Sequence, residues 1–139
     1  MRRYTDVNVW IGRFPYRHLA RTTLHETEQV LREFGFTHAV VCPFEAVFTE
    51  DSYASEKALH EDIERYDGAL RFHQFKLVNP ACSWWRRDLE NALDELSVRG
   101  IRLCPTFHGY DLSAPTTSEI MTMARQCDLP VQIMCRMQD

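Results

Sequence analysis

The feature that most constrains the fold of this chain is a regular alternation of short apolar runs with segments of helical periodicity. The apolar runs have the length of buried strands, and the segments between them repeat apolar residues at helical spacing. The expected strands cover residues 6–12, 38–43, 71–78, 101–105 and 131–136, and the expected helices cover residues 23–34, 55–66, 84–98 and 117–127. Strands that alternate with helices run parallel and are joined by right-handed crossovers. The chain is therefore predicted to be an α/β protein built from parallel (β/α) units.

The first expected strand has two chemically different faces. Aliphatic side chains alternate along it with a carboxylate, an amide and an indole, and successive strand side chains point to opposite sides of a sheet. The aliphatic members are Val7, Val9 and Ile11, and the others are Asp6, Asn8 and Trp10. Buried polar groups need hydrogen-bond partners, so the second face is predicted to line a polar cavity. The aromatic and basic loop at residues 13–18 can cap it.

Local signals set the expected limits of the first helix. Thr23 and Glu26 have the spacing of a capping box, and Gly35 is a typical stop signal. Residues 44–54, before the next helix, are expected to form a long loop between a strand and a helix.

Composition limits the partners and the compartment. The chain has 139 residues, of which 45% are hydrophobic, and this predicts one α/β domain over residues 1–139. The net charge of −4 argues against a broad surface for nucleic acid. No apolar run approaches the roughly 20 residues of a membrane helix. The five cysteines form no C-x-x-C pair and are expected to be reduced thiols. We therefore expect a cytoplasmic protein that recognises a small molecule, without nucleic acid or membrane.

Four landmarks occur in order along the chain and together carry a resemblance. They are Asp6-x-Asn8-x-Trp10-x-Gly12, Val78-Asn79-Pro80, Arg99-Gly100-Ile101-Arg102-Leu103 and Leu129-Pro130-Val131. In this arrangement the chain resembles the amidohydrolase-related family of metal-dependent hydrolases, in the branch that includes decarboxylases and lactonases. The resemblance implies the N-terminal portion of a TIM-barrel-like (β/α)8 fold, incomplete here because such barrels typically need about 250 residues.

The departures from the family pattern concern its metal ligands. The family usually begins with Asp-x-His-x-His, and the two histidine positions are here Asn8 and Trp10. A further family histidine, after Leu-Pro-Val, corresponds to Met134. None of these three is a suitable zinc ligand. We therefore predict no metal and no other cofactor. Because metal-independent lactonases exist in this superfamily, hydrolysis stays possible.

The strand alternation and the resemblance together select candidate binding residues. Substrate-binding residues are expected at the barrel interior and mouth, and they are Asn8, Trp10, Arg102 and Arg136. A planar guanidinium suits a substrate carboxylate. The alternative for both arginines is an internal pair with Asp6, Glu45 or another carboxylate. The alternative for Trp10 is an aromatic plug in the vacated metal site.

The candidate acid or base is His108, which follows the fourth expected strand. Its alternative is an ordinary loop histidine. Arg13 and Arg17 are expected to be solvated loop charges, or else to contact the substrate. The other histidines, His18 among them, are expected to have no catalytic role.

Two functions follow as hypotheses. In the first, the complete protein is an amidohydrolase-like hydrolase or lyase that acts on a small carboxylated metabolite, such as a lactone or another cyclic compound. In the second, the chain is a non-catalytic truncated barrel or assembly module. With five strands, the predicted sheet leaves open edges, so the expected partner chain is a second copy or a complementary C-terminal half-barrel.

Overall fold

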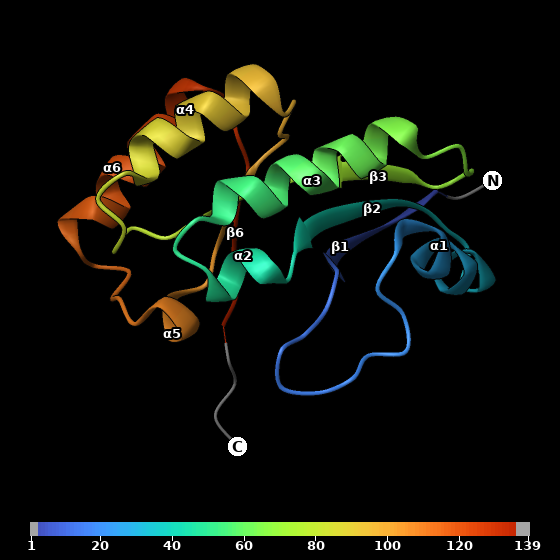
Figure 1. Cartoon of the computed structure of the whole chain (residues 1–139). Helices are drawn as coiled ribbons and strands as arrows, with labels where there is room; N and C mark the ends of the chain where they lie inside the picture. Colours follow the sequence, from blue (N-terminus) through green and yellow to red (C-terminus); the bar gives the residue numbers. More distant parts are fainter. Residues whose placement is uncertain (1–2, 136–139) are drawn as a thin grey trace. The chain divides into compact units, whose positions relative to one another are not determined.

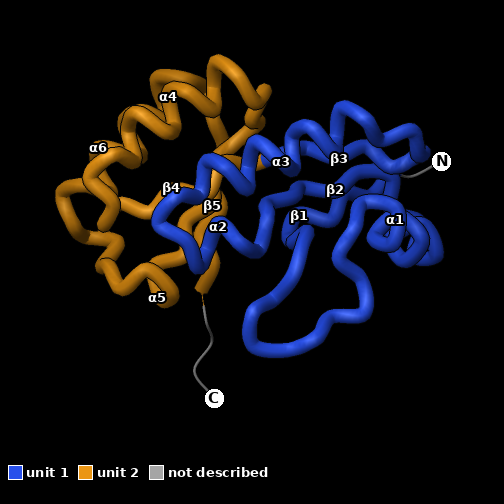
Figure 2. Tube along the Cα trace, viewed as in Figure 1, with its two compact units in different colours: residues 1–74 blue, residues 75–139 orange. Residues whose placement is uncertain are grey.

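The chain folds into two units that share one design. The structure, a computed structural model, describes residues 3–135. Its two units comprise residues 1–74 and residues 75–139 (Figure 2). Each contains a parallel sheet of three strands accompanied by helices (Figure 1). The expected α/β class with parallel strands is thereby confirmed, whereas the single domain over residues 1–139 stays a prediction.

The first unit contains the sheet β1-β2-β3 and three helices. In chain order its elements are β1 (Tyr4–Ile11), α1 (Leu24–Glu33), β2 (Phe36–Pro43), α2 (Glu45–Phe48), α3 (Ser52–Arg65) and β3 (Arg71–Gln74). The capping box expected at the start of α1 is present. The Thr23 hydroxyl accepts a hydrogen bond from the Glu26 N–H at 3.3 Å, and the Glu26 carboxylate accepts one from the Thr23 N–H at 3.0 Å.

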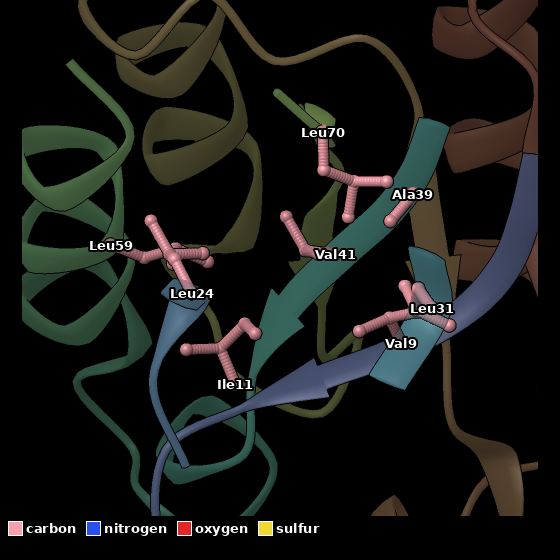
Figure 3. Packing of buried hydrophobic residues seen from close by; sticks show 8 residues of the cluster. All are labelled: Val9, Ile11, Leu24, Leu31, Ala39, Val41, Leu59 and Leu70. Atoms are coloured by element: carbon pink, nitrogen blue, oxygen red, sulfur yellow. The ribbon is translucent and has the colours of Figure 1, made fainter. Parts of the chain in front are cut away.

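The core of the first unit lies between one face of its sheet and the helices α1 and α3. It gathers buried aliphatic side chains, shown together in Figure 3, namely Val9, Ile11, Leu24, Leu31, Ala39, Val41, Leu59 and Leu70. Since strand side chains alternate, Trp10, His38 and His73 are directed away from this core. Val7 does not join the core and is 57% exposed. The register between β1 and β2 shifts between Asp6 and Val9, and this irregularity breaks the expected alternation.

The second unit contains the sheet β4-β5-β6 and three helices. Its elements are β4 (Lys76–Val78), α4 (Trp85–Glu95), β5 (Ile101–Leu103), α5 (Pro105–His108), α6 (Pro115–Gln126) and β6 (Val131–Ile133). Its core joins apolar side chains of the strands to those of α4 and α6, and includes Val78, Leu89, Ile101, Leu103 and Ile120.

Two segments differ from the expected elements. The strand expected over residues 71–78 is divided at Phe75, because β3 pairs with β2 whereas β4 pairs with β5. The loop expected over residues 44–54 contains α2 and the first turn of α3. Buried Ala46 and Val47 hold α2 in place. Four residues are too few for a helical period to be visible in the sequence.

No helix within residues 3–135 is both long enough and apolar enough to cross a membrane. The cytoplasmic location stays a prediction.

Candidate functional site

The candidate site is a cavity of about 800 Å³ formed by the loop that follows β1. Gly12 ends the strand with a φ of +99°, in the left-handed region that favours glycine. Its N–H donates to the Thr22 carbonyl at 2.8 Å. This hydrogen bond brings the two ends of the loop together, as in a compact surface loop whose ends are close. The loop therefore has a defined frame at the carboxyl end of β1.

Aromatic side chains connect the loop to the segment after β2. The Phe14 ring lies 5.5 Å from Phe44 and 5.7 Å from Phe48, measured between centroids. Tyr16 packs edge-on against Phe48 at 5.5 Å. Edge-to-face contacts of this kind are worth about 1 kcal/mol each beyond their buried area. They hold the loop from one side while its arginines stay exposed.

The cavity wall is more basic than acidic. It contains two guanidinium groups, an imidazole and one carboxylate, from Arg13, Arg17, His18 and Glu26. The Glu26 carboxylate accepts hydrogen bonds from the N–H groups of Thr22, at 2.9 Å, and Thr23. These bonds hold the pKa of Glu26 below its usual range. The carboxylate is therefore committed to the helix cap, whereas Arg13 and Arg17 line the cavity as exposed cations.

Trp10 lies on β1, on the side of the sheet away from its helices, and Asn8 lies in the irregular part of the same strand. Asn8 is exposed, and its N–H donates to the Asp6 carboxylate at 2.9 Å. The half-buried Trp10 ring stacks on Phe44, with centroids 5.2 Å apart and planes 15° from parallel. Trp10 thus belongs to the aromatic group that supports the loop, and neither residue lines the cavity.

Arg102 and Gln132 meet in the second unit. Arg102 is fully buried on β5, and its Nε donates to the Gln132 Oε1 at 2.7 Å. Both residues alternate with the core-facing side chains of their strands, so they lie on the face away from α4 and α6, as the alternation predicts. Arg136, the other expected carboxylate-binding arginine, lies outside the described residues.

His108 is the last residue of the short helix α5 and is followed by Gly109 in the left-handed conformation. Its ring lies 6.5 Å from that of Tyr110, centroid to centroid. Burial raises the pKa of the nearby Cys104 thiol to about 11 and raises the pKa of Tyr110 as well. Cys104 is thus a neutral thiol at physiological pH, which makes it a poor nucleophile.

The positions where the resembled family places metal ligands do not fit a metal. Asn8 is exposed, Trp10 is stacked on Phe44, and Met134 offers only a thioether. Within residues 3–135, no three histidine, cysteine or acidic side chains come together in a group that could hold a metal ion. The absence of a resident metal stays a prediction.

In comparisons with protein-family models, curated proteins and solved structures, nothing matched this chain. The resemblance to amidohydrolase-related proteins therefore still depends on the sequence landmarks alone.

Sequence reasoning assigned no role to His18, which lines the cavity together with Arg13 and Arg17. The available signal was the basic and aromatic character of residues 13–18 directly after a strand. That signal predicts a cap over a cavity, but it does not show which side chains of the loop face inward.

Proposed function

We propose that the cavity after β1 binds a small carboxylated metabolite, and that the complete protein is an amidohydrolase-like hydrolase or lyase that acts on it without the usual metal. The observation that carries this proposal is the pair Arg13 and Arg17 in one cavity at the carboxyl end of a parallel strand. In sheets of this kind, ligands bind at the carboxyl ends of the strands and in the loops that follow. An incomplete TIM-barrel-like fold is part of the same proposal.

The chemistry of the wall supports an anionic and partly apolar ligand. A guanidinium can form two parallel hydrogen bonds to one carboxylate. Phe14, Pro15 and Tyr16 offer apolar surface in the same cavity, which suits a lactone or another small ring. The imidazole of His18 can accept and return a proton, the function needed for metal-free ring opening. His18 therefore takes precedence over His108 as the candidate acid or base.

Calorimetric titration of the full chain with citrate, succinate and gluconate tests the binding step. Arg13→Gln and Arg17→Gln are each expected to weaken binding of the best ligand about tenfold, the effect of losing one charged hydrogen bond. Arg71→Gln is the matched control. Arg71 is an exposed arginine of the same unit, but it lies at the amino-terminal end of β3, whereas the cavity lies at the carboxyl end of β1. Its replacement should leave the ligand affinity unchanged. Equal affinity in all three variants and the wild type would contradict the proposal.

A panel of lactones and cyclic carboxylated amides tests the chemical step. His18→Asn should lower kcat by a factor of about 100 with little change in ligand affinity, because general acid–base catalysis typically contributes that much. His108→Asn should leave kcat unchanged. The reverse pattern would return the catalytic role to His108.

The second candidate function is a non-catalytic module, and the packing of Trp10 favours it. Its stacking on Phe44 matches the role of an aromatic plug at a vacated ligand position. Ligand binding without turnover of any panel compound would support this function. For either function, a second copy or a C-terminal half-barrel is the proposed partner chain, and sedimentation velocity at low micromolar concentration tests for it.

A further inference from the structure

A pair of histidines on the first sheet stands apart from the cavity. His38 on β2 and His73 on β3 are both half-buried, and His38 Nδ1 lies 2.9 Å from His73 Nε2. Their ring planes are only 6° from parallel, with centroids 5.2 Å apart. The two rings therefore lie side by side, with one nitrogen of each directed at the other. They share a hydrogen bond in which one ring donates and the other accepts.

The strands position this pair. Val40 on β2 pairs with His73, and His38 pairs with Arg71, so the two imidazoles are diagonal neighbours on the same face. That face is opposite to the one on which Ala39, Val41 and Phe72 pack against the core. Both backbones are fixed by the parallel ladder, so the approach of the two rings needs no further ordering of the main chain.

We infer that His38 and His73 form a bidentate site for a divalent transition-metal ion, with Cu²⁺ preferred over Ni²⁺ and Zn²⁺. Neighbouring ligands of a square-planar or octahedral ion, at metal–nitrogen distances of about 2.0–2.1 Å, lie about 2.9 Å apart. This is the separation of the two facing nitrogens. Imidazole suits these ions, and Cu²⁺ binds most tightly among them. The site is distinct from the family's ligand positions at Asn8, Trp10 and Met134.

Binding requires a tautomer change in the donating ring and a reorientation of both rings. The hydrogen on the donating nitrogen moves to the other nitrogen of the same ring, so that both facing nitrogens present lone pairs to the ion. Each ring then turns by roughly 45°, so that the two lone pairs, which first face one another, meet at a right angle on the ion. Two protein ligands leave the remaining coordination positions to water or to a small ligand.

The neighbouring groups moderate the affinity. Arg71, opposite His38 on the same face, places an exposed cation near the site and opposes a positive ion. On the other side of His38, β1 places Thr5, which carries no charge. Removal of the Arg71 charge should therefore strengthen binding several-fold, a response that a merely structural histidine pair would not show.

Titration of the full chain with Cu²⁺ near neutral pH, followed by calorimetry, is the decisive experiment. We expect one equivalent of Cu²⁺ whose affinity falls roughly tenfold or more in His38→Gln and in His73→Gln, and rises in Arg71→Gln. His60→Gln, which removes a single half-buried histidine from α3, should change nothing. Electron paramagnetic resonance of the wild-type complex adds a test that does not depend on how the variants fold, and it should show two imidazole nitrogens. Affinity that is insensitive to both substitutions, or a spectrum with fewer than two nitrogen ligands, would overturn the site.

Discussion

The two units use the same sheet-and-helix design but differ in the exposure of the cationic side chains on and after their strands. In the first unit a long loop after β1 keeps Arg13, Arg17 and His18 at an open cavity. In the second unit the polar strand residues are withdrawn from solvent, with Arg102 fully buried and Lys76 only 2% exposed. The buried groups are satisfied from within, since the Lys76 Nζ donates to the Leu77 carbonyl at 2.9 Å. The same (β/α) pattern can therefore build a binding surface or a closed polar interior, depending on the loops.

The largest expected effect on stability comes from adding a methyl group to the packed interior of the second unit. A methyl group at Gly100 would overlap the ring of Phe75, which is only 9% exposed. Gly100→Ala should therefore lower the free energy of unfolding by about 2–3 kcal/mol in urea titrations followed by circular dichroism. Gly109→Ala is the control. It meets no neighbouring atom and should cost about 1 kcal/mol through its left-handed backbone alone. Equal losses in the two variants would show that the second unit is not tightly packed there.

A smaller effect is expected in the first unit, where a hydrogen-bond network joins α1 to the turn before β3. The Tyr66 hydroxyl donates to the Glu28 carboxylate at 2.5 Å, and the Ala69 N–H donates to the same carboxylate at 2.9 Å. Tyr66→Phe should cost about 1–2 kcal/mol of unfolding free energy, measured as above. Tyr16→Phe removes an exposed hydroxyl and should cost nothing measurable. If Tyr66→Phe leaves the free energy of unfolding unchanged, these hydrogen bonds contribute no net stability.

The same hydrogen-bond network predicts that the stability of the fold depends on pH in the acidic range. The hydrogen bond from Tyr66 is the largest factor that holds the pKa of Glu28 below its usual range. A carboxyl group with a lowered folded-state pKa stabilises the fold above its unfolded pKa of about 4.3, and this contribution is lost as the pH falls through the folded-state value. The stability difference between wild type and Glu28→Gln should therefore shrink from pH 7 to pH 3. A difference that stays constant over this range would contradict the assignment.

The smallest expected effect is that of metal chelation on the stability of the chain. Because the positions where the resembled family places its metal ligands carry Asn8, Trp10 and Met134, dialysed protein should contain well under one zinc, manganese or iron ion per chain, and EDTA should not shift its unfolding midpoint. Elemental analysis of the dialysed protein provides the first measurement and thermal unfolding the second. A stoichiometric metal whose removal destabilises the chain would contradict both expectations.

Local patterns were sufficient for much of the fold. Apolar runs and helical spacing placed most strands and helices, and the Thr23 and Glu26 spacing located the start of α1. Alternation also accounts for the position of Arg102 on the face away from α4 and α6, where its Nε donates to Gln132. These features depend on residues near one another in sequence or on a strict period of two, which a sequence displays directly.

The missed features depend on contacts between distant segments. Residues 71–78 read as one strand, and only their pairing with β2 and then β5 divides them at Phe75. The exposure of Val7 follows from a register shift that needs a partner strand to exist. The place of His18 in the cavity wall similarly depends on the loop closing on itself and packing on residues after β2. No periodicity within the loop encodes that closure.

The hydrogen bond between Gly12 and Thr22 has a consequence for how such a site can change over time. Because this bond holds the two ends of the loop together, residues 13–21 form a cassette. The length of the cassette can change with little effect on the sheet. Doubling the length of such a loop costs only about 0.6 kcal/mol in closure entropy. Ligand preference can therefore be exchanged by replacing the cassette, either in natural divergence or by grafting, as long as the aromatic anchor at Phe14 is kept.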